Sequence, residues 1–541
     1  MKSITTIFEN KYAGIFCLLL AFANRVVNVF FVSYTGRDKM VVVMQSKNLL
    51  EGNGLSVTQY FTTDIATPVY NFTPLWPPGY PFLLAPFLKV FNYDIYWATT
   101  VLDVLSAIAI IFLIRKLCGQ LKFPIAAVNI ATLVAGCFEY TFISESLPTD
   151  TVSIAFFLTG LSCTFRLLSS DRFSLSAVLF TAFFLFSPLL FRYSYPPLSL
   201  AVGFGVLLTG FIKRDQMLIK KGAWLFVFTL LAIAVFFITL KLTTGHAGYA
   251  LPTERGIFPE NLIHWYPVMP ASLINTAFFS SQVIRYTGLP LNEIMLLLEM
   301  VNLIFLLLLI VFFISLLLKK EFFSALDPFR WFLLIGFIVS AAIFLSLGYL
   351  SLTYEMQRGL EKTWTYIYES RYYAFTILFL QVSFLGWLFL KNAFSKKLFW
   401  KLIAGVCSFV LFIEITHNVY FHSKVAFNFK KYKSAVYREQ DYKYFFTLMD
   451  TIGKKYPGCN IWAGAPGDSF YSLTASYYGY TGIADAANLK QNLPEPNQKT
   501  ILLLMLYDHE WPEYEKFLVE TRAQHLNKTG NSNVFLIELM P

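Results

Sequence analysis

The sequence predicts a polytopic α-helical membrane protein that carries a small α/β domain at its C-terminal end. Of its 541 residues 56% are hydrophobic and only 14% are charged, whereas soluble domains carry about a quarter charged residues. The apolar residues gather in runs long enough to cross a hydrocarbon core of about 30 Å. From about residue 422 onward the chain is polar and rich in Tyr, Asn and Gly, which indicates a separate soluble tail.

Eleven apolar runs are long enough to be membrane spans. They centre on residues 13–33, 97–115, 124–143, 150–168, 174–191, 196–212, 223–241, 293–318, 329–351, 371–390 and 398–420. We interpret the first as a retained span, because no small-residue cleavage site follows it. A further run, Tyr80–Phe91, is only about a dozen residues long and contains Pro81 and Pro86, so we expect an interfacial or re-entrant segment there.

The distribution of Lys and Arg predicts the orientation of these spans. With the N-terminus in the cytoplasm, most loop Lys and Arg fall in the inner connections, as the positive-inside rule requires. These connections are residues 115–122, 169–172, 213–221, 319–330 and 391–401. Counting Tyr80–Phe91 as a span would move the later basic connections outside. The net charge of +10 therefore reflects membrane topology, and no nucleic-acid partner is expected.

Two domains follow from this arrangement. Residues 1–421 are expected to form the transmembrane module, with 34–96 as its first outer loop, and 422–541 an extracytoplasmic domain. In the tail, short strand-like runs alternate with helical stretches, which is typical of a small α/β domain. The strand-like runs are Asn460–Ala463, Thr500–Tyr507 and Asn533–Leu539, and the helical stretches include Asp441–Tyr456 and Pro512–His525.

Asp38 is the leading candidate for chemistry, because it is an acid just past the first span of a chain that otherwise avoids charge. It precedes an expected amphipathic helix, Met40–Leu50, that ends at Gly52. The apolar side chains that could lie against the membrane are Met40, Val43, Met44 and Leu50. A carboxylate at this place could act as a general base toward an acceptor hydroxyl. The alternative is an ordinary interfacial charge between Arg37 and Lys39.

Two further acids, Glu145 and Asp150, lie in the short second outer loop, which contains no Lys or Arg. They could position a cation or hydrogen-bond a sugar. The alternative is a helix N-terminus, where Thr149 or Asp150 begins the next span and an acid interacts favourably with the helix dipole. This alternative explains Asp150 better than Glu145.

Two Arg-Tyr pairs, Arg192-Tyr193 and Arg371-Tyr372, are expected at the outer leaflet, where the positive-inside rule disfavours cations. A phosphate or pyrophosphate partner would explain both, because a guanidinium group holds phosphate oxygens in a fork. The alternatives are binding to lipid headgroups or an ion pair with Glu369.

The third outer loop and the first span supply the remaining candidates. His264 and Arg285 lie in a loop whose mixture of aromatic and polar residues could line a sugar-binding face or be an ordinary interfacial segment. Arg25, flanked by Asn24 and Asn28, is an ionisable residue inside the first span. Such intramembrane charges are functional candidates by default.

Together these motifs resemble GT-C membrane glycosyltransferases, in the branch that includes bacterial protein mannosyltransferases and aminoarabinose transferases. That pattern has an acid after the first span, a helix ending in Leu-x-Gly-x-Gly and a downstream Pro-Pro-Gly-Tyr-Pro. Here these are Asp38, Leu50–Gly54 and Pro77–Pro81. The second-loop acid of the family looks like Glu145, and both Arg-Tyr pairs resemble Arg-Tyr motifs near later spans. The resemblance covers most of the membrane part in scattered short motifs.

The resemblance implies a glycosyltransferase that moves a sugar, with inversion, from a polyprenyl phosphate to an acceptor outside the membrane. It implies Asp38 as general base and Glu145 as an orienting or metal-binding acid. The residues expected to contact substrate are Arg192, Tyr193, Arg371, Tyr372, His264 and Arg285. The partners would be the lipid-linked sugar, the acceptor and membrane lipids.

Two questions stay open at this point. The first loop has no Asp-x-Asp, so we expect weak or absent dependence on Mg²⁺ or Mn²⁺, which Asp38 and Glu145 would bind if a cation is used. The rival functions are a polysaccharide polymerase or ligase and a transporter of lipids or small molecules. Transporters usually keep ionisable groups near mid-membrane and show repeated halves, whereas this sequence shows neither feature clearly.

Overall fold

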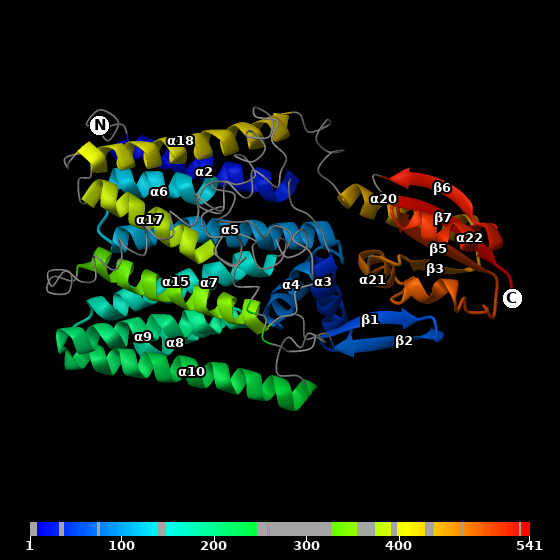
Figure 1. The fold of residues 1–541 in the computed structure, drawn as a ribbon, viewed down its shortest axis with the longest axis horizontal. Coiled ribbons are helices and arrows are strands. Elements are labelled where there is room, and N and C mark those ends of the chain that lie inside the picture. Colours follow the sequence, from blue (N-terminus) through cyan, green and yellow to red (C-terminus); the bar gives the residue numbers. More distant parts are fainter. Residues whose placement is uncertain are drawn as a thin grey trace. The chain divides into compact units, whose positions relative to one another are not determined.

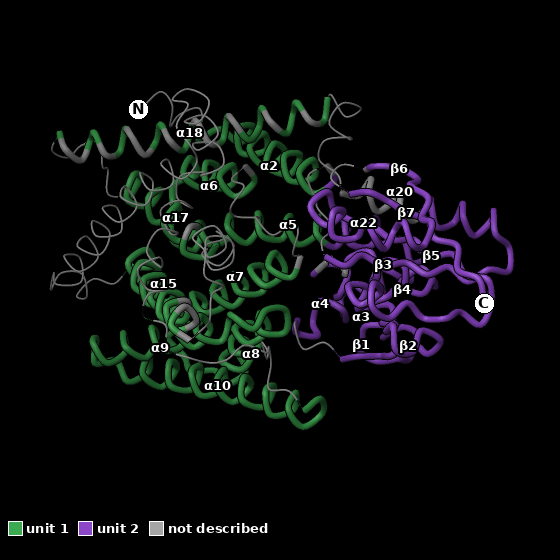
Figure 2. The backbone as a smooth tube through the Cα atoms, turned by 45° about the vertical axis from the view of Figure 1, so that its right-hand side comes forward, with its two compact units in different colours: residues 1–29, 103–144, 149–427 green, residues 30–102, 145–148, 428–541 purple. Residues whose placement is uncertain are grey.

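The computed structural model describes residues 8–31, 37–72, 76–137, 148–245, 257, 259, 327–353, 374–390, 398–427, 438–467, 469–529 and 532–541. The chain divides into two compact units (Figure 2). Unit 1 comprises residues 1–29, 103–144 and 149–427, and unit 2 comprises 30–102, 145–148 and 428–541. The whole of the expected first outer loop, 34–96, thus belongs to the same unit as the tail. The domain boundary placed at residue 421 by composition stays a prediction.

Unit 1 is a bundle of apolar helices that run alongside one another (Figure 1). The described elements that lie wholly or mostly in it are α2 (Lys11–Phe31), α5 (Ile95–Gln120), α6 (Ile125–Cys137), α7 (Pro148–Ser169), α8 (Leu175–Phe186), η2 (Ser187–Leu190), α9 (Pro196–Lys213), α10 (Gln216–Thr244), α15 (Pro328–Thr353), α17 (Ala374–Leu390) and α18 (Leu398–Phe427). Six helices of the described residues are long and apolar enough to cross a membrane. The expected polytopic helical architecture is therefore confirmed.

The predicted spans coincide with or overlap these helices, apart from residues 293–318, which lie outside the described part of the chain. The number of eleven spans and their orientation stay predictions. The short run Tyr80–Phe91 forms a helix of 12 residues, α4 (Gly79–Val90), which is too short to cross a bilayer.

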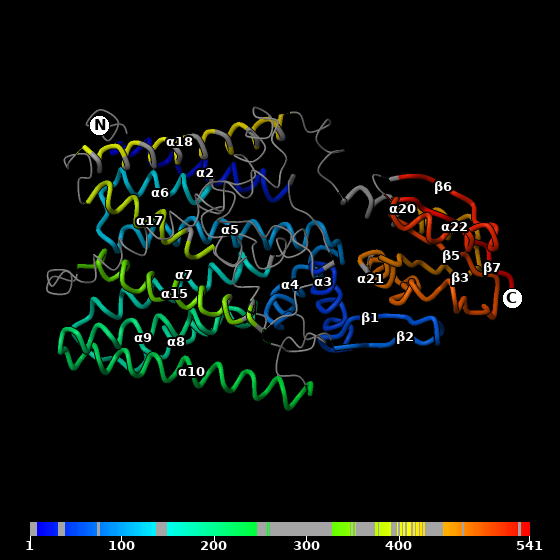
Figure 3. The backbone as a smooth tube through the Cα atoms, viewed as in Figure 1, coloured from blue at the N-terminus to red at the C-terminus, as the bar shows by residue number. Residues whose placement is uncertain are grey.

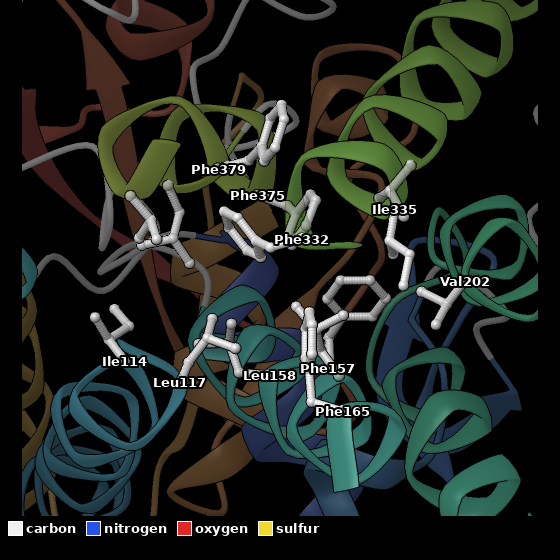
Figure 4. Packing of buried hydrophobic residues seen from close by; sticks show 14 of the residues in the cluster. Ile114, Leu117, Phe157, Leu158, Phe165, Val202, Phe332, Ile335, Phe375 and Phe379 are labelled. Carbon is white, nitrogen blue, oxygen red and sulfur yellow. The ribbon is translucent and has the colours of Figure 1, made fainter. Parts of the chain in front are cut away.

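Aromatic rings from different helices pack together in the core of unit 1 (Figure 4). The rings of Phe157 and Phe375 meet edge to face with centroids 5.0 Å apart, and those of Phe332 and Phe379 lie 5.4 Å apart. A Cβ on Gly336 would come within 2.1 Å of the Phe379 ring, so only glycine allows α15 and α17 to approach this closely. Many of the abundant Phe residues thus pack helix against helix.

Unit 2 contains a seven-stranded mixed sheet with helices (Figure 1). Its elements are α3 (Arg37–Leu50), β1 (Ser56–Phe61), β2 (Asp64–Phe72), α4, α20 (Arg438–Lys455), β3 (Asn460–Gly464), α21 (Ser469–Tyr477), β4 (Thr481–Ile483), η6 (Ala486–Lys490), β5 (Thr500–Tyr507), α22 (Trp511–Glu520), β6 (Gln524–Thr529) and β7 (Ser532–Leu539). The three expected tail strands correspond to β3, β5 and β7. The C-terminal α/β domain is therefore confirmed.

One tail element differs from its prediction. The helix expected over Pro512–His525 ends at Glu520, and its last expected residues begin β6 instead. The chain leaves the helix where Ala523 N donates to Leu518 O over 2.8 Å and Arg522 adopts a positive φ of 51°. The edge strand that follows is short and mostly polar, so its sequence does not show the alternation of apolar and polar residues that predicts a strand.

The sheet joins the first loop to the tail. Its strand order is β2-β1-β4-β3-β5-β7-β6, so a hairpin from the start of the chain lies beside strands from its end (Figure 3). Strands β1, β4, β3 and β5 are parallel, and the remaining neighbours pair antiparallel. The sequence predicted no strand in the first loop.

Candidate functional site

Asp38 lies half-buried in the first turn of α3, within unit 2. An acid in the first turn and Lys47 in the last turn both interact favourably with the dipole of this helix. The helix contacts α4, α21 and β1. Asp38 is thus presented at the end of a packed helix.

The expectation that the apolar side chains of this helix lie against the membrane is wrong for three of them. Met40, Val43 and Met44 are 0% exposed and are covered by protein. Leu50 is half-buried. An apolar stripe has the same spacing whether lipid or protein covers it, so the sequence pattern could not separate the two.

The Leu50–Gly54 motif has a clear conformational role. Gly52 and Gly54 have φ values of +84° and +70°, which residues with a Cβ rarely adopt. Asn53 N donates to Asn48 O over 2.8 Å, which closes the end of the helix. The motif therefore stops α3 and sends the chain into β1.

The Pro77–Pro81 motif begins α4. Pro78 is the N-cap residue, and Phe82 N donates to Pro78 O over 3.2 Å. Pro81 is tolerated because amides of the first turn have no partner within the helix. Tyr80 is fully buried, whereas Phe82 and Val90 are 54% and 74% exposed. An exposed apolar side on so short a helix suits the expected interfacial position.

Arg192 and Asp150 form a buried ion pair in unit 1. Arg192 Nε lies 2.5 Å from Asp150 Oδ1, and the two side chains are 6% and 7% exposed. Asp150 lies in the first turn of α7, as the N-terminus interpretation expected, and Arg192 follows η2. The sequence did not identify this partner of Arg192. Tyr193, the neighbour of Arg192, stacks against Phe237 of α10 with ring centroids 6.2 Å apart.

Five of the expected site residues lie outside the described residues: Glu145, His264, Arg285, Arg371 and Tyr372. Asp38 belongs to unit 2, whereas Arg192 and Tyr193 belong to unit 1. The roles assigned to all eight residues stay proposals.

A hydrogen-bonded group inside unit 1 was only partly anticipated from the sequence. His422 of α18 lies between two amides of α2, with Nδ1 2.8 Å from Asn24 Oδ1 and Nε2 2.8 Å from Asn28 Nδ2. Asn24 Nδ2 also donates to Gly136 O over 2.7 Å. A neutral imidazole protonated at Nδ1 can donate to Asn24 Oδ1 and accept from Asn28 Nδ2. The sequence singled out Arg25 and its flanking amides; the missed signal was His422, one of two histidines in α18.

Comparison with known proteins gives a structural match. Neither a protein-family model nor a curated protein matches the chain. ArnT from Cupriavidus metallidurans in the apo state matches with a TM-score of 0.52 and 11% identity, covering 96% of this chain and 97% of that one. The same protein bound to undecaprenyl phosphate matches with a TM-score of 0.50, 11% identity and the same coverage.

A third match is the oligosaccharyltransferase of Archaeoglobus fulgidus, with a TM-score of 0.48 and 11% identity over 94% of this chain and 69% of that one. Identities this low show the fold alone, and ArnT is matched over nearly the full length of both chains. The chain therefore has the GT-C-like fold of ArnT, a polytopic helical membrane fold that ends in a mixed α/β domain.

Proposed function

We propose that the chain is an integral membrane glycosyltransferase that moves a sugar from a polyprenyl-phosphate-linked donor to an acceptor outside the membrane. The observation that carries the proposal is the match with ArnT over nearly the whole chain, since ArnT has been solved with undecaprenyl phosphate bound. Because a fold by itself does not imply a function, the residues must supply the chemistry. Asp38, half-buried at the start of α3, is the group we assign to it.

In the proposed reaction the acceptor hydroxyl attacks the anomeric carbon of the sugar. Asp38 removes the hydroxyl proton as the new glycosidic bond forms. The bond between the anomeric carbon and the phosphate oxygen breaks, and the configuration inverts. The lipid phosphate leaves already ionised, so its departure needs cationic stabilisation more than protonation.

Cationic stabilisation is the role proposed for Arg192 and Arg371, with Tyr193 and Tyr372 beside them. A guanidinium group can meet two phosphate oxygens at once, whereas Lys offers a point charge. Arg371→Lys should therefore retain part of the activity and Arg371→Ala almost none. The Ala variant should also bind undecaprenyl phosphate more weakly, and unchanged affinity in a folded protein would remove this assignment.

The reaction is tested on purified full-length protein. The probes are undecaprenyl phosphates carrying a hexose, a pentose or an aminopentose, and the readout is release of undecaprenyl phosphate, measured by mass spectrometry. Asp38→Asn should lower turnover by about 10²–10⁴. Asp64→Asn, an exposed acid on β2, is the matched control and should leave turnover unchanged. Activity of Asp38→Asn within a few-fold of wild type would refute the general-base role.

The products separate the rival functions. A polymerase or ligase would also release lipid phosphate but would join the sugar to a growing glycan, which the product mass reveals. A transporter would move the lipid across a vesicle membrane and leave the sugar–phosphate bond intact.

The proposed orientation places the N-terminus in the cytoplasm and the tail outside. Reporter fusions after Lys221 and Lys397 should report the cytoplasm, and fusions after Gly248 and Pro541 the outside, because basic connections stay inside. A cytoplasmic C-terminus would overturn this orientation.

A further inference from the structure

The first loop completes the sheet of the tail. Strand β1 pairs with β4 at Tyr60 and Ile483, and Ala484 N donates to Tyr60 O over 2.9 Å. Asp485, just past β4, accepts two hydrogen bonds from Thr62: one from its amide at 2.9 Å and one from its hydroxyl at 2.7 Å. These two residues are 423 positions apart in the chain. Backbone and side-chain bonds thus connect the loop and the tail along one strand.

A second connection reaches the helix that carries Asp38. The tail residue Tyr477 is 2% exposed at the end of α21. Its backbone oxygen accepts a hydrogen bond from Lys47 Nζ in the last turn of α3. The same Nζ lies 5.0 Å from the centre of the Tyr477 ring, within the range of a cation–π interaction.

The hydroxyl of Tyr477 makes a third contact. It donates to Tyr93 O over 2.8 Å, in the turn between α4 and α5. Tyr93 has a φ of +63°, so a tight turn fixes the orientation of its carbonyl. One buried tail residue therefore contacts two separate segments of the first loop, the end of α3 and the end of α4.

Burial also extends to higher pH the range over which this hydroxyl can donate. Desolvation raises the pKa of Tyr477 above its ordinary value, and the nearby Tyr478, Tyr93, Asp94 and Glu51 raise it further. The phenol is therefore neutral at physiological pH.

We infer that the C-terminal domain positions the α3 helix of Asp38, and that Tyr477 and Lys47 are positioning residues for that carboxylate. This inference rests on the proposed function of Asp38. Lys47 lies nine residues after Asp38, which is about 13 Å along a rigid helix axis. A shift of the helix at Lys47 therefore moves Asp38, and a misplacement of about 1 Å can lower a rate by about 10²-fold.

The loss of positioning is separable from the loss of folding. Tyr477→Phe removes the bond to Tyr93 O but keeps the ring beside Lys47, and it leaves the α4 and β1 contacts of α3 intact. The matched control is Tyr514→Phe, because the Tyr514 hydroxyl lies 3.5 Å from Ala487 O, within the tail itself. Lys47→Met is the second variant, and Lys47→Arg is its conservative counterpart.

The experiment uses the full-length protein with an undecaprenyl-phosphate-linked sugar. Tyr477→Phe and Lys47→Met should each lower kcat by roughly 10–10²-fold, with KM for the donor within about threefold of wild type. Lys47→Arg should recover most of kcat, and Tyr514→Phe should match wild type. Amide hydrogen exchange over Met40–Lys47 should speed up in Tyr477→Phe and Lys47→Met and stay unchanged in Tyr514→Phe.

Wild-type kcat or unchanged α3 exchange in both Tyr477→Phe and Lys47→Met would overturn the inference. If one of these two variants fails to fold, the kcat and the α3 exchange of the other variant test the inference. A failure of the proposed function gives a different result, since Asp38→Asn would then retain activity. In that case faster α3 exchange in the variants would still support docking of α3 by the tail, and unchanged exchange would overturn that as well.

Discussion

Removing either partner of the Arg192–Asp150 pair should destabilise the protein strongly, whereas removing both should not. The two charges lie 2.5 Å apart with side chains 6% and 7% exposed. At an effective dielectric of about 20, charges this close attract by about 7 kcal/mol. Desolvation offsets much of that attraction while the pair is intact. Once one partner is gone, the remaining buried charge should cost about 3–5 kcal/mol.

The variants are Arg192→Met, Asp150→Leu and the combination of the two. Each single variant should lower the free energy of unfolding by about 3–5 kcal/mol, and the double variant should lie close to wild type, since apolar side chains can replace a buried pair. The assay is a denaturant titration of detergent-solubilised protein. The partly exposed pair Arg330–Asp327, at 3.7 Å with side chains 23% and 45% exposed, is the control and should contribute about 0–1 kcal/mol.

The double variant also tests the proposed phosphate role of Arg192. If Arg192 binds the lipid phosphate as well as Asp150, the double variant should be stable but should bind undecaprenyl phosphate more weakly. If stability and affinity both match wild type, the pair is structural only and the phosphate role is refuted. Additive losses in the double variant would refute the stability reasoning, because independent sites add and coupled sites do not.

Three further predictions concern other parts of the molecule. His422→Phe should lower the free energy of unfolding by about 1–3 kcal/mol, because it removes two hydrogen bonds of 2.8 Å. A double-mutant cycle with Asn28→Leu should give a coupling energy of about 0.6–1.7 kcal/mol, and strict additivity of the two substitutions would contradict this. The pKa of Tyr477 is raised in the folded protein. The neutral phenol therefore stabilises the fold fully below about pH 10, and this stabilisation is lost as the pH rises through the folded pKa. The melting temperature should fall more steeply above about pH 10 in wild type than in Tyr477→Phe, and parallel curves would contradict this. EDTA should reduce activity little or not at all, and complete loss restored by Mn²⁺ would show that the expected weak metal dependence is wrong.

Local chemistry made several features predictable from the sequence. The end of α3 could be placed because Gly52 and Gly54 adopt φ values that other residues avoid. The run Tyr80–Phe91 could be separated from the spans because it is only about a dozen residues long, and the helix found there, α4, has 12 residues. The buried strand β5 could be found because a short continuous apolar run, residues 501–507, is typical of a strand buried on both faces.

Long-range pairing was not predictable by the same reasoning. The hairpin β1–β2 carries no strong alternation, and β2 is largely exposed with Pro68 inside it. Its partner strand β4 has only three residues and lies hundreds of positions away. The pairing of Asp150 with Arg192 was missed for a related reason. The sequence places both at one membrane face but carries no information on which charges meet.

The shared sheet bears on the membrane topology, because a hydrogen-bonded sheet cannot be divided by a bilayer. Strands β1 and β4 are neighbours, so residues 56–61 and 481–483 must lie on the same side of the membrane. An even number of spans must then separate them. The eleven-span arrangement places ten spans between the first loop and the tail, whereas counting Tyr80–Phe91 as a further span would make that number odd. The pairing thus supports, independently of charge, both an interfacial α4 and a tail on the side of Asp38.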